Sequence, residues 1–192
     1  MNLMDLCNAE NDNIIELRRT FHKYPEPYWR EFWTTWKIIE YLEKLPLKLY
    51  LGEDIIDKNM VINYPKEEEI QKAKEFAEEN GADLSYLEKS NGFTGVVAEL
   101  DTGRRGKTTI FRFDMDSNEI YESEDESHIP FKCGFNSLHK GCAHCCGHDG
   151  HISIGLTTAK VLCEFKEHLN GKIIFIFQPG EETVVEIGRA HV

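Results

Sequence analysis

The sequence predicts an α/β fold, a mostly parallel central sheet flanked by helices. Three observations lead to this prediction. Residues 172–177 form a continuous run of apolar, β-branched and aromatic side chains, which is typical of a strand buried on both faces of a sheet. Two further strand patterns, at 95–100 and 108–113, come earlier in the chain. The apolar spacing of residues 149–169 is helical, as expected of a crossover that joins parallel strands.

The composition is that of a globular protein with one sizeable core. The chain has 192 residues, of which 41% are hydrophobic and 29% charged. Its net charge of −12 argues against nucleic acid or an anionic membrane as the main partner. No apolar run approaches the ~20 residues that span a bilayer, and residues 1–10 lack the features of a secretory signal.

The cysteines predict a reducing compartment. Four of the six lie between Cys133 and Cys146, beside several histidines. This crowding favours free thiols and metal chemistry over disulfides. We therefore expect a cytoplasmic protein.

The first half of the chain is predicted to be mainly helical. Apolar spacing predicts helices at 13–24 and 31–45, each followed by prolines that end it. Residues 53–92 are richer in charge and poorer in pattern, so we interpret them as an insertion. The remaining predicted elements are a strand at 47–51, an exposed helix at 66–80 and a short helix near 84–87.

The strongest candidate for a functional site is the stretch His144–His151. It contains five potential soft or borderline metal ligands and a carboxylate, just where a helix begins. If the backbone there is extended, Cys146 and His148 project to the same side and can bind one ion. The helix N-terminus is also expected to favour the thiolate form of the cysteine.

Two acidic pairs are expected to converge on this loop. Asp114 and Asp116 follow one predicted strand, and Glu181 and Glu182 follow the last one. The ligand crevice of an open α/β sheet lies outside the carboxyl ends of its strands. Carboxylate, imidazole and thiolate can hold a divalent ion there, while a carboxylate that is not a ligand takes a proton from water. In an extended Glu181–Glu182 the two side chains diverge, so they can divide these roles.

Four motifs carry a resemblance to a known family. They are His22-x-x-Pro25-Glu26 with Glu31 and Thr34, Arg112-x-Asp114-x-Asp116, His144-x-Cys146-Gly-His148-Asp149-Gly-His151, and Phe177-Gln178-Pro179-x-Glu181-Glu182. The chain resembles the metallopeptidase and amidohydrolase superfamily of aminoacylases, carboxypeptidase G, hippurate hydrolases and indole-acetyl-amino-acid hydrolases. Within it, residues 53–92 and 125–131 are most similar to the aminobenzoyl-glutamate hydrolase branch.

The resemblance implies a zinc-peptidase-like catalytic domain that cleaves the amide bond of small N-acyl or N-aroyl amino acids, with aminobenzoyl-glutamate as a candidate. It implies two divalent metal ions, Mn²⁺ or Zn²⁺, with Cys146, His148 and Glu182 as ligands. Glu181 is implied as the general base and acid, and Asp116 as a second catalytic carboxylate. The full-length form is expected to be a dimer or hetero-oligomer.

The sequence departs from the family at three places. Cys145 stands where a small residue is usual, and Asp116-Ser117-Asn118-Glu119 replaces Asp-Ala-Leu-Pro. The family also continues past the glutamate pair with further ligands and a lid domain. We therefore expect residues 1–186 to be the N-terminal part of a catalytic domain, inactive alone. Residues 187–192 match the translation of a sequencing adapter and are expected to be a foreign tail.

A different class of site remains open. Cys133, Cys142, Cys145 and either His148 or a neighbour could together hold one closed structural zinc in a module without catalysis. Zinc ribbons usually show two Cys-x2-Cys pairs, and this region has only the pair Cys142 and Cys145.

Overall fold

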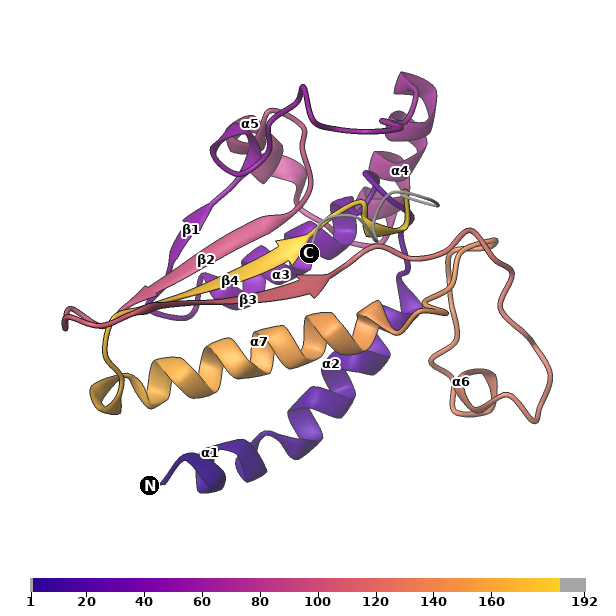
Figure 1. The fold of residues 1–192 in the computed structure, drawn as a ribbon. Helices are drawn as coiled ribbons and strands as arrows, with labels where there is room; N and C mark the ends of the chain where they lie inside the picture. The colour runs from indigo at the N-terminus through magenta and orange to yellow at the C-terminus, as the bar shows by residue number, and fades with distance from the viewer. Residues whose placement is uncertain (1, 184–192) are drawn as a thin grey trace.

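The structure is a computed structural model that describes residues 2–183, and it has a four-stranded sheet at its centre (Figure 1). The strands are β1 (Lys48–Tyr50), β2 (Val96–Asp101), β3 (Thr108–Asp114) and β4 (Lys172–Gln178), in the order β1-β2-β4-β3. The α/β prediction is confirmed, and the three later strands lie within a residue or so of their predicted positions.

The sheet is mixed, so the expectation of a mostly parallel sheet was wrong for the described strands. Only β3 and β4 run parallel, whereas β1 with β2 and β2 with β4 are antiparallel. The physical reason is the short connection at 102–107. It has no room for a crossover, so β2 and β3 must run in opposite directions. The predicted crossover helix does join the parallel pair.

The helices match the apolar periodicity of the sequence. The four long ones are α2 (Asn11–Lys23), α3 (Phe32–Leu42), α4 (Glu67–Glu79) and α7 (His148–Glu164). The short helices are α1 (Leu3–Ala9), α5 (Leu87–Ser90) and α6 (Ile129–Lys132), and the 3₁₀ turns are η1 (Gly52–Asp54), η2 (Leu84–Tyr86), η3 (Lys166–His168) and η4 (Glu181–Thr183). The short helix predicted near 84–87 corresponds to η2 and the start of α5, whereas α1 and α6 were not predicted. No helix within residues 2–183 is both long and apolar enough to cross a membrane.

One face of the sheet forms the core with the helices. Phe175 and Phe177 of β4 are completely or almost completely buried, while the alternate side chains Ile174 and Ile176 are only half-buried. Among the described residues, β4 therefore has one buried face and one half-buried face, although its continuous apolar run predicted burial on both. Helix α4 is exposed along most of its surface, as predicted, but it also contributes to the core, since Ile70 is 3% exposed.

Helix α7 sits unusually close to the sheet, because it presents a glycine to it. A Cβ atom at Gly155 would lie 2.7 Å from the ring of Phe177 and 2.8 Å from that of Phe113. This close approach holds the first residue of α7, His148, near the carboxyl ends of β3 and β4. The proposed tail at 187–192 lies outside the described residues, and the proposed limits of the domain and the insertion stay predictions.

Candidate metal centre

Three segments meet at the carboxyl ends of the parallel strands: the residues after β3, the first turn of α7, and η4 after β4 (Figure 1). Two groups of possible metal ligands have all their donor atoms within 4.8 Å of one another. One is Asp114, His148 and His151, and the other is His148, Glu181 and Glu182. The predicted convergence of the acidic pairs on the histidine loop is confirmed, and His148 belongs to both groups.

His148 is oriented by Asp116. Its Nδ1 lies 2.8 Å from the main-chain oxygen of Asp116 and 3.2 Å from the carboxylate oxygen Oδ1. The main-chain oxygen accepts a hydrogen bond and the carboxylate adds a negative charge beside it, so Nδ1 carries a hydrogen and Nε2 points the other way. Nε2 lies 3.9 Å from Oε2 of Glu181 and 3.9 Å from Oε1 of Glu182. Two nearby carboxylates favour a positive charge at this nitrogen, either a proton or a metal ion.

The protonation of His148 shows how strongly this position attracts positive charge. Burial lowers the pKa of His148, but the hydrogen bonds to Asp116 and the charges of Asp116 and Asp114 outweigh it and raise the pKa to about 9. The metal-free ring is therefore an imidazolium at neutral pH. A divalent ion at Nε2 would take the place of that proton.

Asp116 connects the two sides of the centre. It is completely buried, and its Oδ2 accepts a hydrogen bond of 2.7 Å from the main-chain N–H of Glu182. The same carboxylate thus orients the ring of His148 and the backbone of Glu182. Carboxylates behind a histidine ligand commonly fix its tautomer and direction. A catalytic role for Asp116 stays a prediction, since the structure places it behind the ring.

The two adjacent glutamates have different surroundings. The side chain of Glu181 is 41% exposed and that of Glu182 is 22% exposed. Burial, followed by the charges of Asp114 and Glu182, raises the pKa of Glu181. A raised pKa suits a carboxylate that takes up a proton and returns it. Glu182, whose backbone is tied to Asp116, is better placed to be a fixed ligand.

The loop that carries both glutamates is held by a buried acid, Glu31, whose motif gave it no assigned role. Oε1 of Glu31 accepts a hydrogen bond of 2.9 Å from the N–H of Gly180, and Oε2 accepts one of 2.7 Å from Thr94. Burial and the charge of Asp116 raise the pKa of Glu31 to about 8. Glu31 is completely buried and adds a further acid behind the centre.

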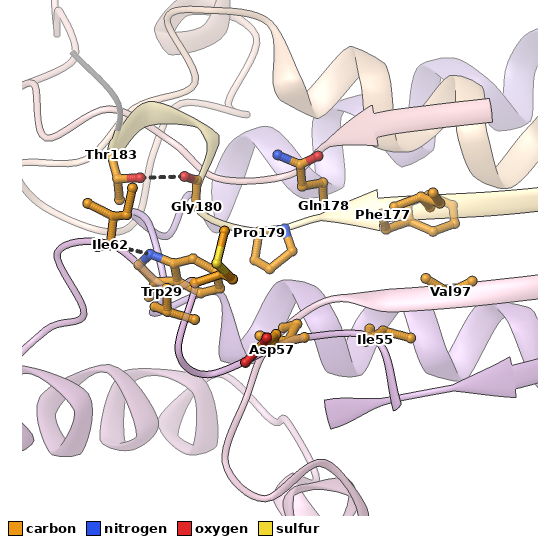
Figure 2. Close-up of a pocket in the computed structure, with 14 residues that line it drawn as sticks. Trp29, Ile55, Asp57, Ile62, Val97, Phe177, Gln178, Pro179, Gly180 and Thr183 are labelled. Atoms are coloured by element: carbon orange, nitrogen blue, oxygen red, sulfur yellow. Dashed lines mark hydrogen bonds between the residues drawn. The ribbon is translucent and has the colours of Figure 1, made fainter. Parts of the chain in front are cut away.

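Trp29 packs against the same loop (Figure 2). A Cβ atom at Gly180 would lie 2.6 Å from the Trp29 ring, and the indole N–H donates to the main-chain oxygen of Ile62. Trp29 itself has a φ of 57°, a left-handed conformation that is rare for a bulky residue. The pocket in Figure 2 has a volume of about 370 Å³ and a mainly apolar lining that includes neither Glu181 nor Glu182.

Cys146 lies beside the centre with a geometry that differs from the expectation. Gly147 has a φ of 85°, so the backbone is not extended, and Cys146 precedes the helix while His148 is its first residue. Its side chain is hydrogen-bonded to Glu182, and this bond, followed by burial, raises the pKa of the thiol. The helix N-terminus therefore does not produce a thiolate in the metal-free protein, because the neighbouring carboxylate outweighs it.

The structure does not bring all the predicted ligands together. Among the described residues, neither close group of donors contains Cys146. It also does not assemble the alternative zinc site there: Cys133 and Cys145 are exposed, and Cys142 is buried, with the pKa of its thiol raised to about 11 by burial. All six cysteines are free.

Two other histidines of the motif have distinct places. Nδ1 of His151 lies 3.4 Å from the carboxylate of Asp114, and its ring stacks on His148 with centroids 5.2 Å apart. His144 is buried away from the close donor groups, and burial lowers its pKa to about 3. His151 is therefore part of the centre's wall, a role that the motif alone did not assign.

The donor set fits divalent cations. Four carboxylates gather around His148, and the guanidinium of Arg112 lies 2.7 Å from one of them, Asp114. Grouped carboxylates with imidazole are the ligands of zinc and manganese sites. An added divalent ion would remove much of the repulsion within this cluster.

Known proteins share sequence with the segments that form this centre. The family model described as peptidase family M20/M25/M40 matches residues 110–191. The chain is 40% identical over 181 residues to a p-aminobenzoyl-glutamate hydrolase subunit of Escherichia coli, covering 94% of this chain and 42% of that protein. It is 45% identical over 170 residues to indole-3-acetyl-aspartic acid hydrolase of Enterobacter agglomerans, covering 88% of this chain and 39% of that protein.

Solved structures agree with these matches. The aminobenzoyl-glutamate utilization protein of Klebsiella pneumoniae superposes with a TM-score of 0.74 at 36% identity, over 95% of this chain and 40% of that one. The YXEP protein of Bacillus subtilis, described as a dinuclear metal-binding peptidase of the M20 family, gives a TM-score of 0.63 at 28% identity, over 93% and 38% of the two chains. The chain thus spans about two fifths of the length of these relatives. The resemblance expected from the motifs is confirmed.

Proposed function

This chain is related to the M20/M25/M40 peptidases, and from that premise we propose that it supplies the metal centre of a hydrolase that cleaves the amide bond of N-acyl or N-aroyl amino acids. The observation that carries the proposal is the position of His148. Its Nδ1 is held by Asp116, and its Nε2 faces Glu181 and Glu182 at 3.9 Å. This is the arrangement of a histidine ligand with its orienting carboxylate beside a second ligand and a base.

The residues of the centre have separate roles in the proposed reaction. We assign His148, Glu182 and Cys146 as ligands of two divalent ions, which when bound would polarise the amide carbonyl and make water more acidic. Glu181 removes a proton from the attacking water, because its pKa is raised and its side chain is partly exposed. It then delivers this proton to the nitrogen of the departing amino acid, so that the C–N bond breaks and a neutral amine leaves.

Substrate class and assembly rest on the relatives. Two of them are named for aminobenzoyl-glutamate and for indole-3-acetyl-aspartate. Both compounds join an aromatic acyl group to an acidic amino acid, and we propose this class for the protein that contains this chain. One relative is named as one component of a larger enzyme, which supports a dimer or hetero-oligomer.

Metal and compartment are proposed from the side chains. Thiolate and imidazole suit zinc, whereas the grouped carboxylates also suit manganese, so either ion is proposed. The six free cysteines favour the cytoplasm. We expect residues 1–192 alone to turn over little substrate, because the donor groups within residues 2–183 are too few to complete the shells of two ions.

The test compares two neighbouring substitutions. Glu181→Gln should keep bound metal and lose turnover of aminobenzoyl-glutamate, measured in the native protein that contains this chain. Glu182→Gln should instead lower the metal content measured by atomic emission. Equal metal loss in the two variants would reject the assignment of base and ligand.

A further inference from the structure

A buried histidine outside the metal centre holds the helix turn on which His148 stands. His22 lies in the last turn of α2 and is 7% exposed. Its Nδ1 is 2.8 Å from Oδ2 of Asp149, and its Nε2 is 2.8 Å from Oε1 of Glu122. Burial lowers the pKa of His22, but its hydrogen bonds to the two carboxylates outweigh this and raise it. Both ring nitrogens face carboxylate oxygens, which accept hydrogen bonds, so both nitrogens donate.

Asp149 directly follows His148 and is completely buried. Its Oδ1 accepts a hydrogen bond of 2.8 Å from the N–H of Gly150, in the first turn of α7. Its other oxygen, Oδ2, accepts from His22 and, at 3.3 Å, from the largely exposed Arg18. His22 is thus the buried partner that ties this turn to α2.

The second nitrogen of His22 serves a different part of the molecule. Glu122 also accepts a hydrogen bond from the N–H of Ser137, and its Oε1 lies 2.8 Å from Nε2 of His128. These contacts belong to the 122–137 loop, which contains none of the proposed ligands. The two ring nitrogens of His22 therefore have separable tasks, one toward the centre and one away from it.

We propose that His22 is a positioning residue of the metal centre: through its Nδ1 bond to Asp149 it fixes the first turn of α7 and so the direction of Nε2 of His148. The inference rests on the proposed function, since it needs His148 to be a ligand. His148 is held on one side by Asp116 and on the other by the turn that Asp149 anchors. Removing the bond from His22 leaves Oδ2 of the buried Asp149 with only the exposed Arg18 as partner, so the turn shifts or loosens.

The experiment separates the two nitrogens of the ring. The side-chain amide nitrogen of asparagine lies near the place of Nδ1, and that of glutamine lies near the place of Nε2. His22→Asn therefore keeps a donor for Asp149, whereas His22→Gln keeps a donor for Glu122. Zn²⁺ affinity is measured by competition with a chromophoric chelator on the native protein that contains this chain. The free energy of unfolding without metal is measured beside it.

We expect His22→Asn to bind Zn²⁺ about as tightly as the parent, and His22→Gln to bind it about tenfold or more weakly, the usual cost of losing a partner behind a ligand. The Co²⁺-loaded His22→Gln variant should also show a changed visible spectrum. If His22 had a purely structural role, both variants would be less stable and would bind Zn²⁺ with the same affinity. Equal affinities of the two variants overturn the proposal.

A double-mutant cycle covers the case in which His22→Gln folds poorly. In an Asp149→Asn background the step from His22 to Gln should change Zn²⁺ affinity by less than about twofold, because the coupled pair is already broken. A full loss of about tenfold in that background contradicts the proposal. If the parent protein that contains this chain binds neither Zn²⁺ nor Co²⁺, the proposed metal centre itself fails, which is a different result from equal affinities of the variants.

Discussion

The two sides of the metal centre are built differently. On the α7 side, His148 is buried and its ring is fixed by Asp116, which is itself completely buried. On the η4 side, Glu181 and Glu182 are partly exposed, and hydrogen bonds hold the backbone of their loop. The difference indicates that the ligand His148 is preorganised, while the side chain of Glu181, which transfers protons, keeps freedom to move.

The largest effect should come from the side that transfers protons. Glu181→Gln removes the base but keeps the size of the side chain, so turnover should fall by about 10²- to 10⁴-fold with metal content unchanged. Steady-state hydrolysis by the native protein that contains this chain measures it. Turnover within about tenfold of the parent would mean that another group is the base.

The next effect tests the preorganised side. Asp116→Asn should weaken Zn²⁺ binding by about 10- to 100-fold, because the ring of His148 loses an orienting carboxylate. Chelator competition measures the affinity. Glu119→Gln is a matched control on the same loop, whose carboxylate binds Arg30 at 3.0 Å and none of the proposed ligands. Equal affinities of the two variants would contradict the role of Asp116.

The close packing of α7 against the sheet can be tested with substitutions at two glycines of that helix. Gly155→Ala should lower the free energy of unfolding by about 1–3 kcal/mol, because the new methyl group would overlap the Phe177 and Phe113 rings. Gly150→Ala meets no atom within 4 Å and should be neutral or stabilising by up to ~1 kcal/mol. Chemical denaturation compares them, and equal stability of the two variants would show that α7 can move off the sheet.

Stability of the metal-free protein should depend on pH through His148. The folded-state pKa of His148 is raised from 6.5 to about 9. Its stabilising contribution is therefore complete below pH 6.5 and is lost as the pH rises through about 9. Denaturation midpoints at several pH values should decline across this window, and His148→Gln should decline less. An equal decline in both proteins would place the cause elsewhere.

The smallest change concerns Cys146. If its thiolate binds metal, bound Zn²⁺ should slow alkylation of Cys146, which is exposed in the metal-free protein. The Cys142→Ser variant serves as the background, because it should keep its metal under the amidohydrolase assignment and lose it under the structural zinc assignment. Mass spectrometry reads the labelled position, and equal labelling rates with and without Zn²⁺ would exclude Cys146 as a ligand.

Local patterns predicted the elements, and contacts between distant residues determined the rest. Apolar spacing was enough for α2, α3 and α7, and the motifs named His148, Glu181 and Glu182. The direction of the strands was missed because it depends on pairing. Nor could the sequence show that His22 bonds Asp149, 127 positions away, or that Glu31 bonds Gly180, 149 positions away. Both pairs join segments that only the folded chain brings together.

The most direct test of the ligand role of His148 is the state of its two ring nitrogens. Long-range ¹H–¹⁵N spectra of the native protein that contains this chain should show both nitrogens of His148 protonated at neutral pH without metal, as its raised pKa requires. On addition of Zn²⁺, Nδ1 should stay protonated against Asp116, and Nε2 should lose its proton and shift to a metal-bound position. An Nε2 signal that does not change when Zn²⁺ binds would contradict the account.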